Sequence, residues 1–332
     1  MKKNVLLTSN FSKSYNIMGL FSSLFSSAKP EEDNKQEGDL QNFDLLKYDG
    51  IRALRINKPK YAVKCFTEAL KIQIDIETMK YLMTAYNALD MTDEALETLD
   101  AMVATGEEQV DTLLMRANFL YMNEQYPEAI VDCEQIIELN PENFTAYFLW
   151  AKTEQQTGEY EKAIGHLDKA INLKEDFVEG YTLRADVYLA MKRGDDALAD
   201  VEKVIKLAPE DETAYLLRGR IHELLGDHEA ALLDYQSVLD LNPFNEVAYL
   251  LMGRLLMACE KYNDALVLYN EAIENIENFA DAYTARAIVK HQIGDKEGAL
   301  ADEMIAIELN PDEINLPDEN PNFDDLYKGG IY

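Results

Sequence analysis

A period of 34 residues constrains the fold of this chain more than any other feature of its sequence. Pro209 and Pro243 lie one period apart, and Pro141 and Pro311 each lie two periods beyond them. Alanines keep the same spacing at Ala95, Ala129, Ala163, Ala197, Ala231, Ala265 and Ala299. Tyrosines keep it at Tyr147, Tyr181, Tyr215, Tyr249 and Tyr283. Agreement between these registers indicates a row of similar units, each of which contacts mainly its neighbours.

Each position in the period has a physical interpretation. One slot holds Gly219 and Gly253, and alanine in other units, and such small residues let two helices approach closely. Gly158, Gly226 and Gly294, each followed by an acidic residue, are expected to end a first helix and turn the chain. The proline is expected to end a second helix, because it cannot continue the helical hydrogen bonds. The pattern therefore predicts a unit of helix, turn and helix.

The pattern resembles the tetratricopeptide repeat family, and Tyr215, Gly219, Ala231, Tyr235 and Pro243 carry the resemblance together with their equivalents one period away. It implies an all-α fold, an α-solenoid of about eight stacked helix-turn-helix repeats in a right-handed superhelix. First helices would line its concave groove. The repeats are predicted at 43–75, 76–109, 110–143, 144–177, 178–211, 212–245, 246–279 and 280–313, between a partly disordered N-terminal extension and linker at 1–42 and an acidic tail or short cap at 314–332.

Charge and cysteine content limit the kinds of partner and compartment. The 332 residues include 62 acidic and 31 basic side chains, which give a formal net charge of −31. Nucleic acids and anionic membrane surfaces both require basic residues, so we expect no nucleic-acid partner and no membrane insertion. Cys65, Cys133 and Cys259 have no close spacing, which favours a reducing compartment without disulfides. Cys133 takes the slot of Tyr235 and is expected to pack in a core.

The segments outside the repeats leave alternatives open. The chain is expected to be cytoplasmic, or exported if residues 1–28 act as a signal segment. Residues 30–42 are expected to form a solvated linker. In the tail, Phe323, Leu326 and Tyr327 follow a helical spacing, which favours a turn that caps the last repeat. The alternative is a tail that docks in the groove. We expect a monomer or a weak homo-oligomer.

Four units combine an arginine with an aspartate sixteen residues later. The arginines are Arg116, Arg184, Arg218 and Arg286, and the aspartates are Asp132, Asp200, Asp234 and Asp302. Units without the arginine also lack the aspartate: Trp150 goes with His166, and Met252 goes with Leu268. Because the two slots change together, we predict that they touch and form an ion pair between the two helices of one repeat. The alternative is that these arginines bind a ligand.

The resemblance also implies which first-helix positions face the groove. The predicted peptide-binding residues are Phe148, Lys152, Leu216, Arg220, Leu250, Arg254 and Met257. Leu216, Leu250 and Met257 make an apolar patch, and Lys152, Arg220 and Arg254 add positive charge beside it. The hypothesis is a groove for an extended or helical peptide with an apolar anchor and a nearby carboxylate. The alternative is that these are ordinary solvated residues.

One variant of the family holds the C-terminal carboxylate of chaperones with lysines, asparagines and an arginine at set groove positions. Here Lys80 is followed by Thr84 instead of asparagine, and the next repeats offer Leu114 and Phe148. The set of clamp residues is incomplete. The sequence therefore disfavours a role in binding chaperone tails.

No arrangement of residues predicts catalysis. The histidines form no metal-ligand pair, and the sequence contains no CxxC, no phosphate-binding glycine loop and no GxSxG motif. We therefore expect no enzymatic activity, no metal and no cofactor. The predicted function is a protein–protein interaction scaffold that binds a peptide or protein segment in the concave groove. The alternative is a structural or assembly protein that acts through self-association or its convex surface.

Overall fold

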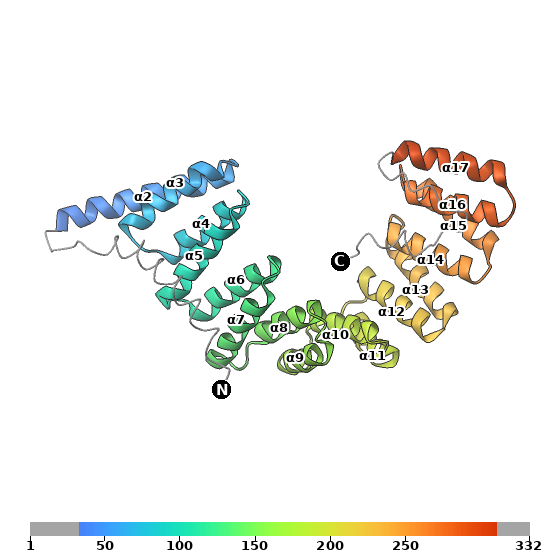
Figure 1. Cartoon of the computed structure of the whole chain (residues 1–332), viewed down its shortest axis with the longest axis horizontal. Coiled ribbons are helices and arrows are strands. Elements are labelled where there is room, and N and C mark those ends of the chain that lie inside the picture. Colours follow the sequence, from blue (N-terminus) through green and yellow to red (C-terminus); the bar gives the residue numbers. More distant parts are fainter. Residues whose placement is uncertain (1–32, 311–332) are drawn as a thin grey trace, which may run out of the picture. The chain divides into compact units, whose positions relative to one another are not determined.

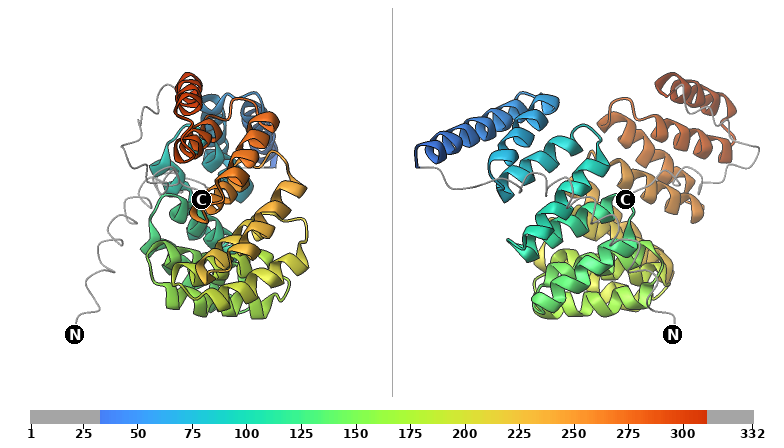
Figure 2. Two further views of the ribbon diagram at one scale, coloured as in Figure 1. Left: turned by 90° about the vertical axis from the view of Figure 1, so that its right-hand side faces the viewer. Right: turned by 60° about the vertical axis from the view of Figure 1, so that its left-hand side comes forward.

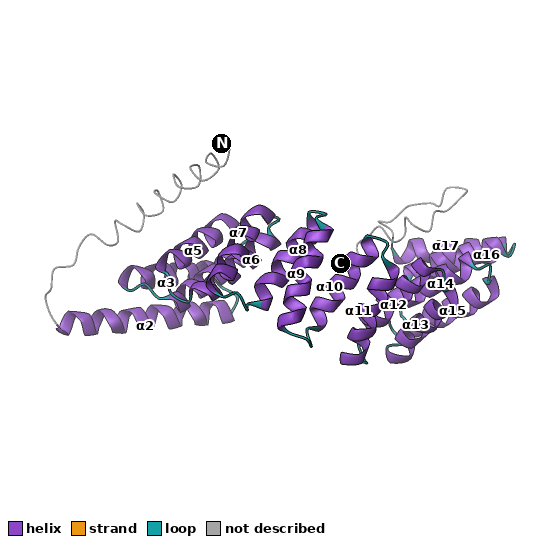
Figure 3. Ribbon diagram, turned by 90° about the horizontal axis from the view of Figure 1, so that it is seen from below, coloured by secondary structure: helices purple, strands orange, loops and turns teal. Residues whose placement is uncertain are grey.

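The computed structural model describes residues 33–310, and this part of the chain contains only α-helices and the loops that join them (Figures 1 and 3). The helices are α2 (Asp33–Arg55), α3 (Pro59–Ile72), α4 (Ile76–Asn87), α5 (Thr92–Thr105), α6 (Gln109–Met122), α7 (Tyr126–Leu139), α8 (Phe144–Gln156), α9 (Tyr160–Leu173), α10 (Val178–Ala190), α11 (Gly194–Leu207), α12 (Glu212–Leu225), α13 (His228–Leu241), α14 (Glu246–Ala258), α15 (Tyr262–Asn275), α16 (Ala280–Gln292) and α17 (Lys296–Leu309). The predicted all-α fold is confirmed.

Successive helices pack on one another, which makes the fold an α-solenoid of helical repeats. A first helix contacts the second helix of its own pair, as α12 contacts α13, and that helix contacts the next first helix, α14 (Figure 2). The chain divides into two compact units, unit 1 up to Thr157 with α2–α8 and unit 2 from Gly158 with α9–α17. None of the described helices is both long and apolar enough to span a bilayer. The right-handed superhelix and the repeat boundaries stay predictions.

The expected linker at 30–42 is wrong over most of its length, because α2 already begins at Asp33. This helix has 23 residues, whereas the other described helices have 12 to 14. Residues 33–42 are polar but contain no proline, and a helix that is already nucleated extends easily through such a segment. The expectations for residues 1–28 and for the tail from 314 onward lie outside the described residues.

The turn between the two helices of each pair has one residue in the left-handed conformation. These residues are Asn57, Asp90, Glu124, Gly158, Lys192, Gly226, Glu260 and Gly294, spaced by 33 residues once and by 34 thereafter. Glycine adopts this conformation without the steric conflict that a Cβ atom introduces. The predicted turning role of the three glycines is confirmed, and the backbone requires the same conformation where the residue is not glycine.

This turn leads to a pair of substitutions with opposite expected signs. Gly226→Ala should lower the free energy of unfolding by about 1 kcal/mol, because φ is +80° there and nothing lies within 4 Å of the new Cβ to compensate. Lys192→Gly at φ 59° should raise it by about 0.5 kcal/mol, because the left-handed strain is removed while the unfolded chain gains freedom. Urea unfolding of both variants measures the two signs. A gain in stability for Gly226→Ala would contradict this account of the turn.

The second helices end at the same place whether or not proline follows. α13 ends at Leu241, two residues before Pro243, and α11 ends at Leu207, two residues before Pro209. α9 and α15 end at the equivalent position, although the proline slot there holds Glu175 and Glu277. Proline is therefore compatible with this helix end, and packing of the next first helix suffices to set it.

The small slot of a first helix faces the residue sixteen positions later on the second helix. A Cβ atom added at Gly219 would lie 2.4 Å from the ring of Tyr235, and one at Gly50 would lie 2.4 Å from Phe66. Glycine therefore occurs where the opposite side chain is a large buried ring. Alanine occurs where a smaller side chain is opposite, as Ala117 and Cys133 share one core cluster and Ala185 and Val201 another.

The expected burial of Cys133 is confirmed. Its side chain is fully buried, and burial raises the pKa of its thiol to about 12.

Candidate functional site

The predicted arginine–aspartate pairs are all formed. Nε of Arg116 donates to Oδ2 of Asp132 at 2.8 Å, and Nη2 donates to Oδ1 at 2.6 Å. Arg184 binds Asp200 through the same two nitrogens at 2.7 Å each. The other two pairs repeat this contact between first and second helix: Arg218 with Asp234 and Arg286 with Asp302. The carboxylates are buried, so these are partly desolvated ion pairs and not surface contacts.

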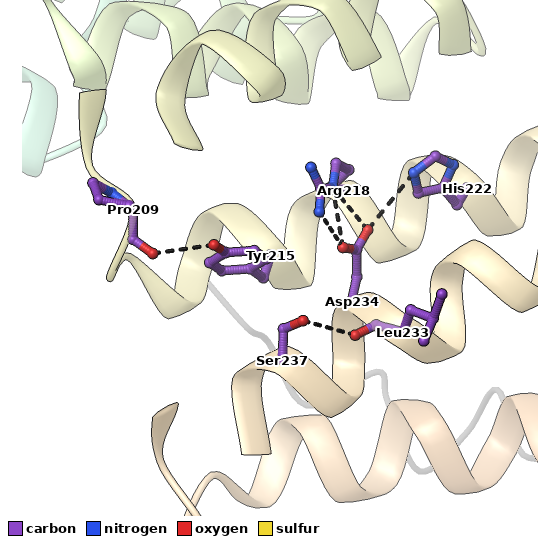
Figure 4. Close-up of polar contacts among 7 residues, drawn as sticks. All are labelled: Pro209, Tyr215, Arg218, His222, Leu233, Asp234 and Ser237. Carbon is purple, nitrogen blue, oxygen red and sulfur yellow. Dashed lines mark hydrogen bonds and ion pairs between the residues drawn. The ribbon is translucent and has the colours of Figure 1, made fainter. Parts of the chain in front are cut away.

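Figure 4 shows the surroundings of one pair in unit 2. Arg218 reaches down from α12 to Asp234 on α13, and Nε2 of His222 lies 3.7 Å from the same carboxylate. Three residues before the arginine, the hydroxyl of Tyr215 donates to the carbonyl oxygen of Pro209 at 3.1 Å. The guanidinium of Arg218 lies 5.5 Å from the centre of the Tyr215 ring, a cation–π distance. The tyrosine register therefore supports the arginine register.

A third partner of these arginines was not predicted. Nη1 of Arg116 donates to Asp100 on α5 at 2.7 Å, so this guanidinium joins α5, α6 and α7. Nη1 of Arg184 donates to Asp168, and Nη1 of Arg286 donates to Asn270 at 2.8 Å. In each case the partner precedes the arginine by sixteen residues and belongs to the previous repeat. The arginines therefore link adjacent repeats as well as the two helices of one repeat.

Electrostatics at the last of these sites agree with the geometry. Burial raises the pKa of Asp302, but hydrogen bonds from Arg286 and Lys290 outweigh burial and hold it below its usual value. Nζ of Lys290 lies 2.7 Å from Oδ2 of this carboxylate. The internal partners occupy the arginines, which supports the structural interpretation over the ligand-binding one.

The predicted groove residues fall in both units. Phe148 and Lys152 lie on α8 in unit 1, and the Lys152 ammonium is 4.6 Å from the centre of the Tyr121 ring on α6. Leu216 and Arg220 lie on α12 in unit 2. The remaining three lie on α14: Leu250, Arg254 and Met257.

Within unit 2 the structure brings the three apolar groove residues together. Leu216, Leu250 and Met257 are half-buried and pack against one core cluster that includes Val238 and Tyr249. We call Leu216, Arg220, Leu250 and Met257 the α12–α14 patch. Arg220 is exposed, and none of the ion pairs found among the described side chains involves it. The patch therefore combines a partly buried apolar surface with a solvent-accessible cation.

Arg254 has a different environment from the one that the sequence suggested. Its Nη2 lies 2.8 Å from Oε2 of Glu223 on α12, and the hydroxyl of Tyr235 donates to the same carboxylate. Burial and this hydrogen bond raise the pKa of Tyr235 above its ordinary value. Glu223 therefore neutralises Arg254. The sequence places both residues on inward rows but gives no sign that they pair, because the contact joins adjacent repeats and occurs once.

Asp186 is the acidic neighbour of the α12–α14 patch. It lies on α10, and burial raises the pKa of its carboxyl while the positive charge of Arg220 acts in the opposite direction. No group of His, Cys, Asp and Glu side chains suited to a metal ion occurs in the described part of the chain. The arrangement offers surface complementarity and charge, which suit recognition of another molecule.

Two family profiles match the sequence. The tetratricopeptide repeat profile matches residues 182–246. The profile of the anaphase-promoting complex, cyclosome, subunit 3, matches twice, at 88–170 and 122–204. The second match is displaced from the first by 34 residues at both ends, so it is the repeat pattern that this profile matches. A search of curated proteins finds no matching relative.

Solved structures show the same fold at low sequence identity. A tetratricopeptide repeat protein from Parabacteroides merdae is 17% identical with a TM-score of 0.56, over 75% of this chain and 99% of that one. The C-terminal part of a repeat protein from Cytophaga hutchinsonii is 18% identical with a TM-score of 0.59, over 72% and 97%. PilF of Pseudomonas aeruginosa is 17% identical with a TM-score of 0.50, over 61% and 92%. Together with the repeated helix pairs, these matches identify the chain as a tetratricopeptide repeat protein.

Proposed function

We propose that unit 2 binds a peptide segment of a partner protein on its inward first-helix rows. Tetratricopeptide repeat folds generally mediate protein–protein interactions and generally lack enzymatic activity. The observation that carries the proposal is the α12–α14 patch, where half-buried leucines and a methionine lie beside the exposed Arg220. A methionine-containing apolar surface adapts to varied side chains, and an arginine can bind a carboxylate with two hydrogen bonds.

The expected ligand is a peptide with an apolar anchor next to an acidic residue. Arg220 stands out because the chain as a whole carries a net charge of −31 and repels acidic molecules elsewhere. Arg254 has a supporting role in this proposal, because Glu223 already binds it and the pair fixes the wall of the patch. Phe148 and Lys152 remain predicted groove residues of unit 1.

Selection from a random peptide library displayed on phage tests the proposal directly. The full-length chain is immobilised, and the selected peptides are then measured by fluorescence anisotropy. We expect them to share an apolar residue near an acidic one, and Arg220→Glu to weaken their binding by about ten- to a hundredfold, as for a lost charge-assisted hydrogen bond.

The matched control is Arg55→Glu, which makes the same charge change at an exposed position on α2 in unit 1. It should change the affinity by no more than about twofold, since exposed charges are screened beyond roughly 10 Å. Selected peptides without an acidic residue, or equal losses for both variants, would contradict the proposed site.

We further propose a cytoplasmic location. Cys65, Cys133 and Cys259 are all free thiols, as is usual for proteins in reducing compartments. Alkylation of the protein in intact cells, followed by mass spectrometry, checks this: the partly exposed Cys259 should be recovered as a reduced thiol.

A further inference from the structure

Each interior second helix is covered by the first helix of the next repeat. On α13, Leu232, Tyr235 and Leu239 belong to the surfaces that meet α14. On α14, the opposing residues are Ala248, Leu251 and Leu255, all of them buried. The contact between α13 and α14 therefore defines what each side of a repeat junction looks like.

The last described helix, α17, carries the second-helix side of such a junction. Leu300 and Ile307 occupy the slots of Leu232 and Leu239, two periods later. They are 58% and 42% exposed, and Met304 between them is 58% exposed. The three residues follow one helical face at i, i+4 and i+7. This end face has the apolar character of an interior junction without a described helix over it.

The first described helix, α2, carries the complementary side. Counted back from the left-handed turn residues Asn57 and Glu260, Leu45 takes the slot of Ala248 and Tyr48 takes that of Leu251. Leu45 is 61% exposed and Tyr48 is 65% exposed. Arg52 takes the third slot, that of Leu255, and is also exposed.

Charge is complementary between these two end faces. Glu303 on α17 takes the slot of Tyr235, whose ring packs against Leu251 and Leu255 at the interior junction. The same register would place Glu303 of one molecule opposite Tyr48 and Arg52 of another. An acidic side chain thus occurs on one face where the other face presents a basic one.

We propose that a second copy of this chain covers each end, with α2 of one molecule packed on α17 of the next. The junction would continue the repeat stack from copy to copy, with Leu300 near Tyr48 and Ile307 near Leu45. The segment after α17 in the same chain is a poorer occupant by its sequence. A further first helix in register would span 314–326, where Pro317 and Pro321 interrupt the pattern of a helix.

Such a contact joins two different faces, so it does not close on itself in a dimer. Each added molecule leaves one free end of each kind, and the result is an open series of oligomers. The net charge of −31 on every copy opposes association at low salt. Added salt screens this long-range repulsion, so we expect larger oligomers as the salt concentration rises.

Sedimentation velocity of the full-length chain over a wide concentration range tests the proposal. We expect wild type to form monomer, dimer and trimer in proportions that depend on concentration. Leu45→Asp and Leu300→Asp should each be monomeric, because each destroys one of the two faces. An equimolar mixture of the two variants should form a dimer and nothing larger, because only one pair of intact faces remains.

The control is Leu233→Asp, which changes a leucine that is 69% exposed on α13 away from both ends. It should associate like wild type. Dimers of Leu45→Asp alone, or a mixture that stays monomeric, would overturn the proposal. Wild type that is monomeric throughout, with a lower unfolding midpoint for Leu300→Asp, would overturn it in favour of residues 311–332 as the cover of α17. A lost peptide affinity for Arg220→Glu is independent of these results.

Discussion

Replacing Arg116 by methionine should lower the free energy of unfolding around α5–α7 by about 3 kcal/mol, the loss typical of a buried ion pair that loses one partner. Asp132 is the reason, because its side chain is only 2% exposed and Arg116 supplies both of its bonds from α6. Asp100 loses the same partner but is 39% exposed, so water can replace its bond. The loss therefore comes mainly from the stranded carboxylate of Asp132.

The chain itself supplies the compensating change. At the equivalent slots of another repeat, Met252 is paired with Leu268, which is buried in a core cluster. The double variant Arg116→Met, Asp132→Leu should recover most of the lost stability, because two apolar side chains need no compensation for desolvation. A double variant no more stable than the single one would contradict this interpretation.

Acid should reduce the defect of the single variant. Burial already raises the pKa of the Asp132 carboxyl, while the hydrogen bonds from Arg116 act against it. Without the arginine, the folded-state pKa rises further above the unfolded value. The folded form then binds more protons, so its stability increases as pH falls. The difference between Arg116→Met and wild type should therefore shrink from pH 7 to pH 5.

Trp150 provides the measurement for these variants. It is the sole tryptophan of the chain, and it packs beside Ala117 and Cys133 in unit 1. Its fluorescence during urea unfolding reports on the repeat that contains Arg116. Denaturation curves at several pH values for wild type and for the single and double variants give all the comparisons required.

The second large effect is expected at Gly253. Its replacement by alanine should lower the free energy of unfolding by about 2 kcal/mol, which combines overpacking of up to about 3 kcal/mol with a gain of about 1 kcal/mol in helix propensity. The new Cβ atom would lie 2.1 Å from Oη and 2.2 Å from Cζ of Tyr269, whose ring is fully buried. The ring cannot move aside without disturbing the core of α14 and α15.

A double-mutant cycle separates the clash from other effects. In a Tyr269→Val background, Gly253→Ala should become stabilising, because Ala185 and Val201 already share a core with that combination of sizes. Gly165→Ala is the control on a helix surface, since nothing lies within 4 Å of its added Cβ. It should raise stability by about 0.5–1 kcal/mol. Destabilisation by Gly253→Ala in both backgrounds would exclude the clash as its cause.

The repetition within this sequence explains which features could be predicted. Eight variants of one unit show which slots change together, so the contact of Arg116 with Asp132 follows from the comparison with Trp150 and His166. The small slot and the turn glycines are predictable for the same reason. A contact that recurs leaves a pattern, and the pattern has the period of the fold.

Contacts that occur once leave no such pattern. The bond between Arg254 and Glu223 depends on two long side chains that meet across one junction, and no other repeat reproduces it. The bond of Arg116 to Asp100 was missed because Glu134 holds the equivalent slot before Trp150, where no arginine is present. The early start of α2 was missed because a polar composition is compatible with both a linker and a solvated helix.

The three-way bonds of the arginines divide the array into blocks that should open together. Arg116 ties α5 to α6 and α7, Arg184 ties α9 to α10 and α11, and Arg286 ties α15 to α16 and α17. In a repeat protein, cooperativity is set by the coupling between nearest neighbours. α14 carries Met252 instead of arginine and depends on packing alone for that coupling. Unit 2 would therefore separate first at α14, between two blocks whose helices unfold as groups.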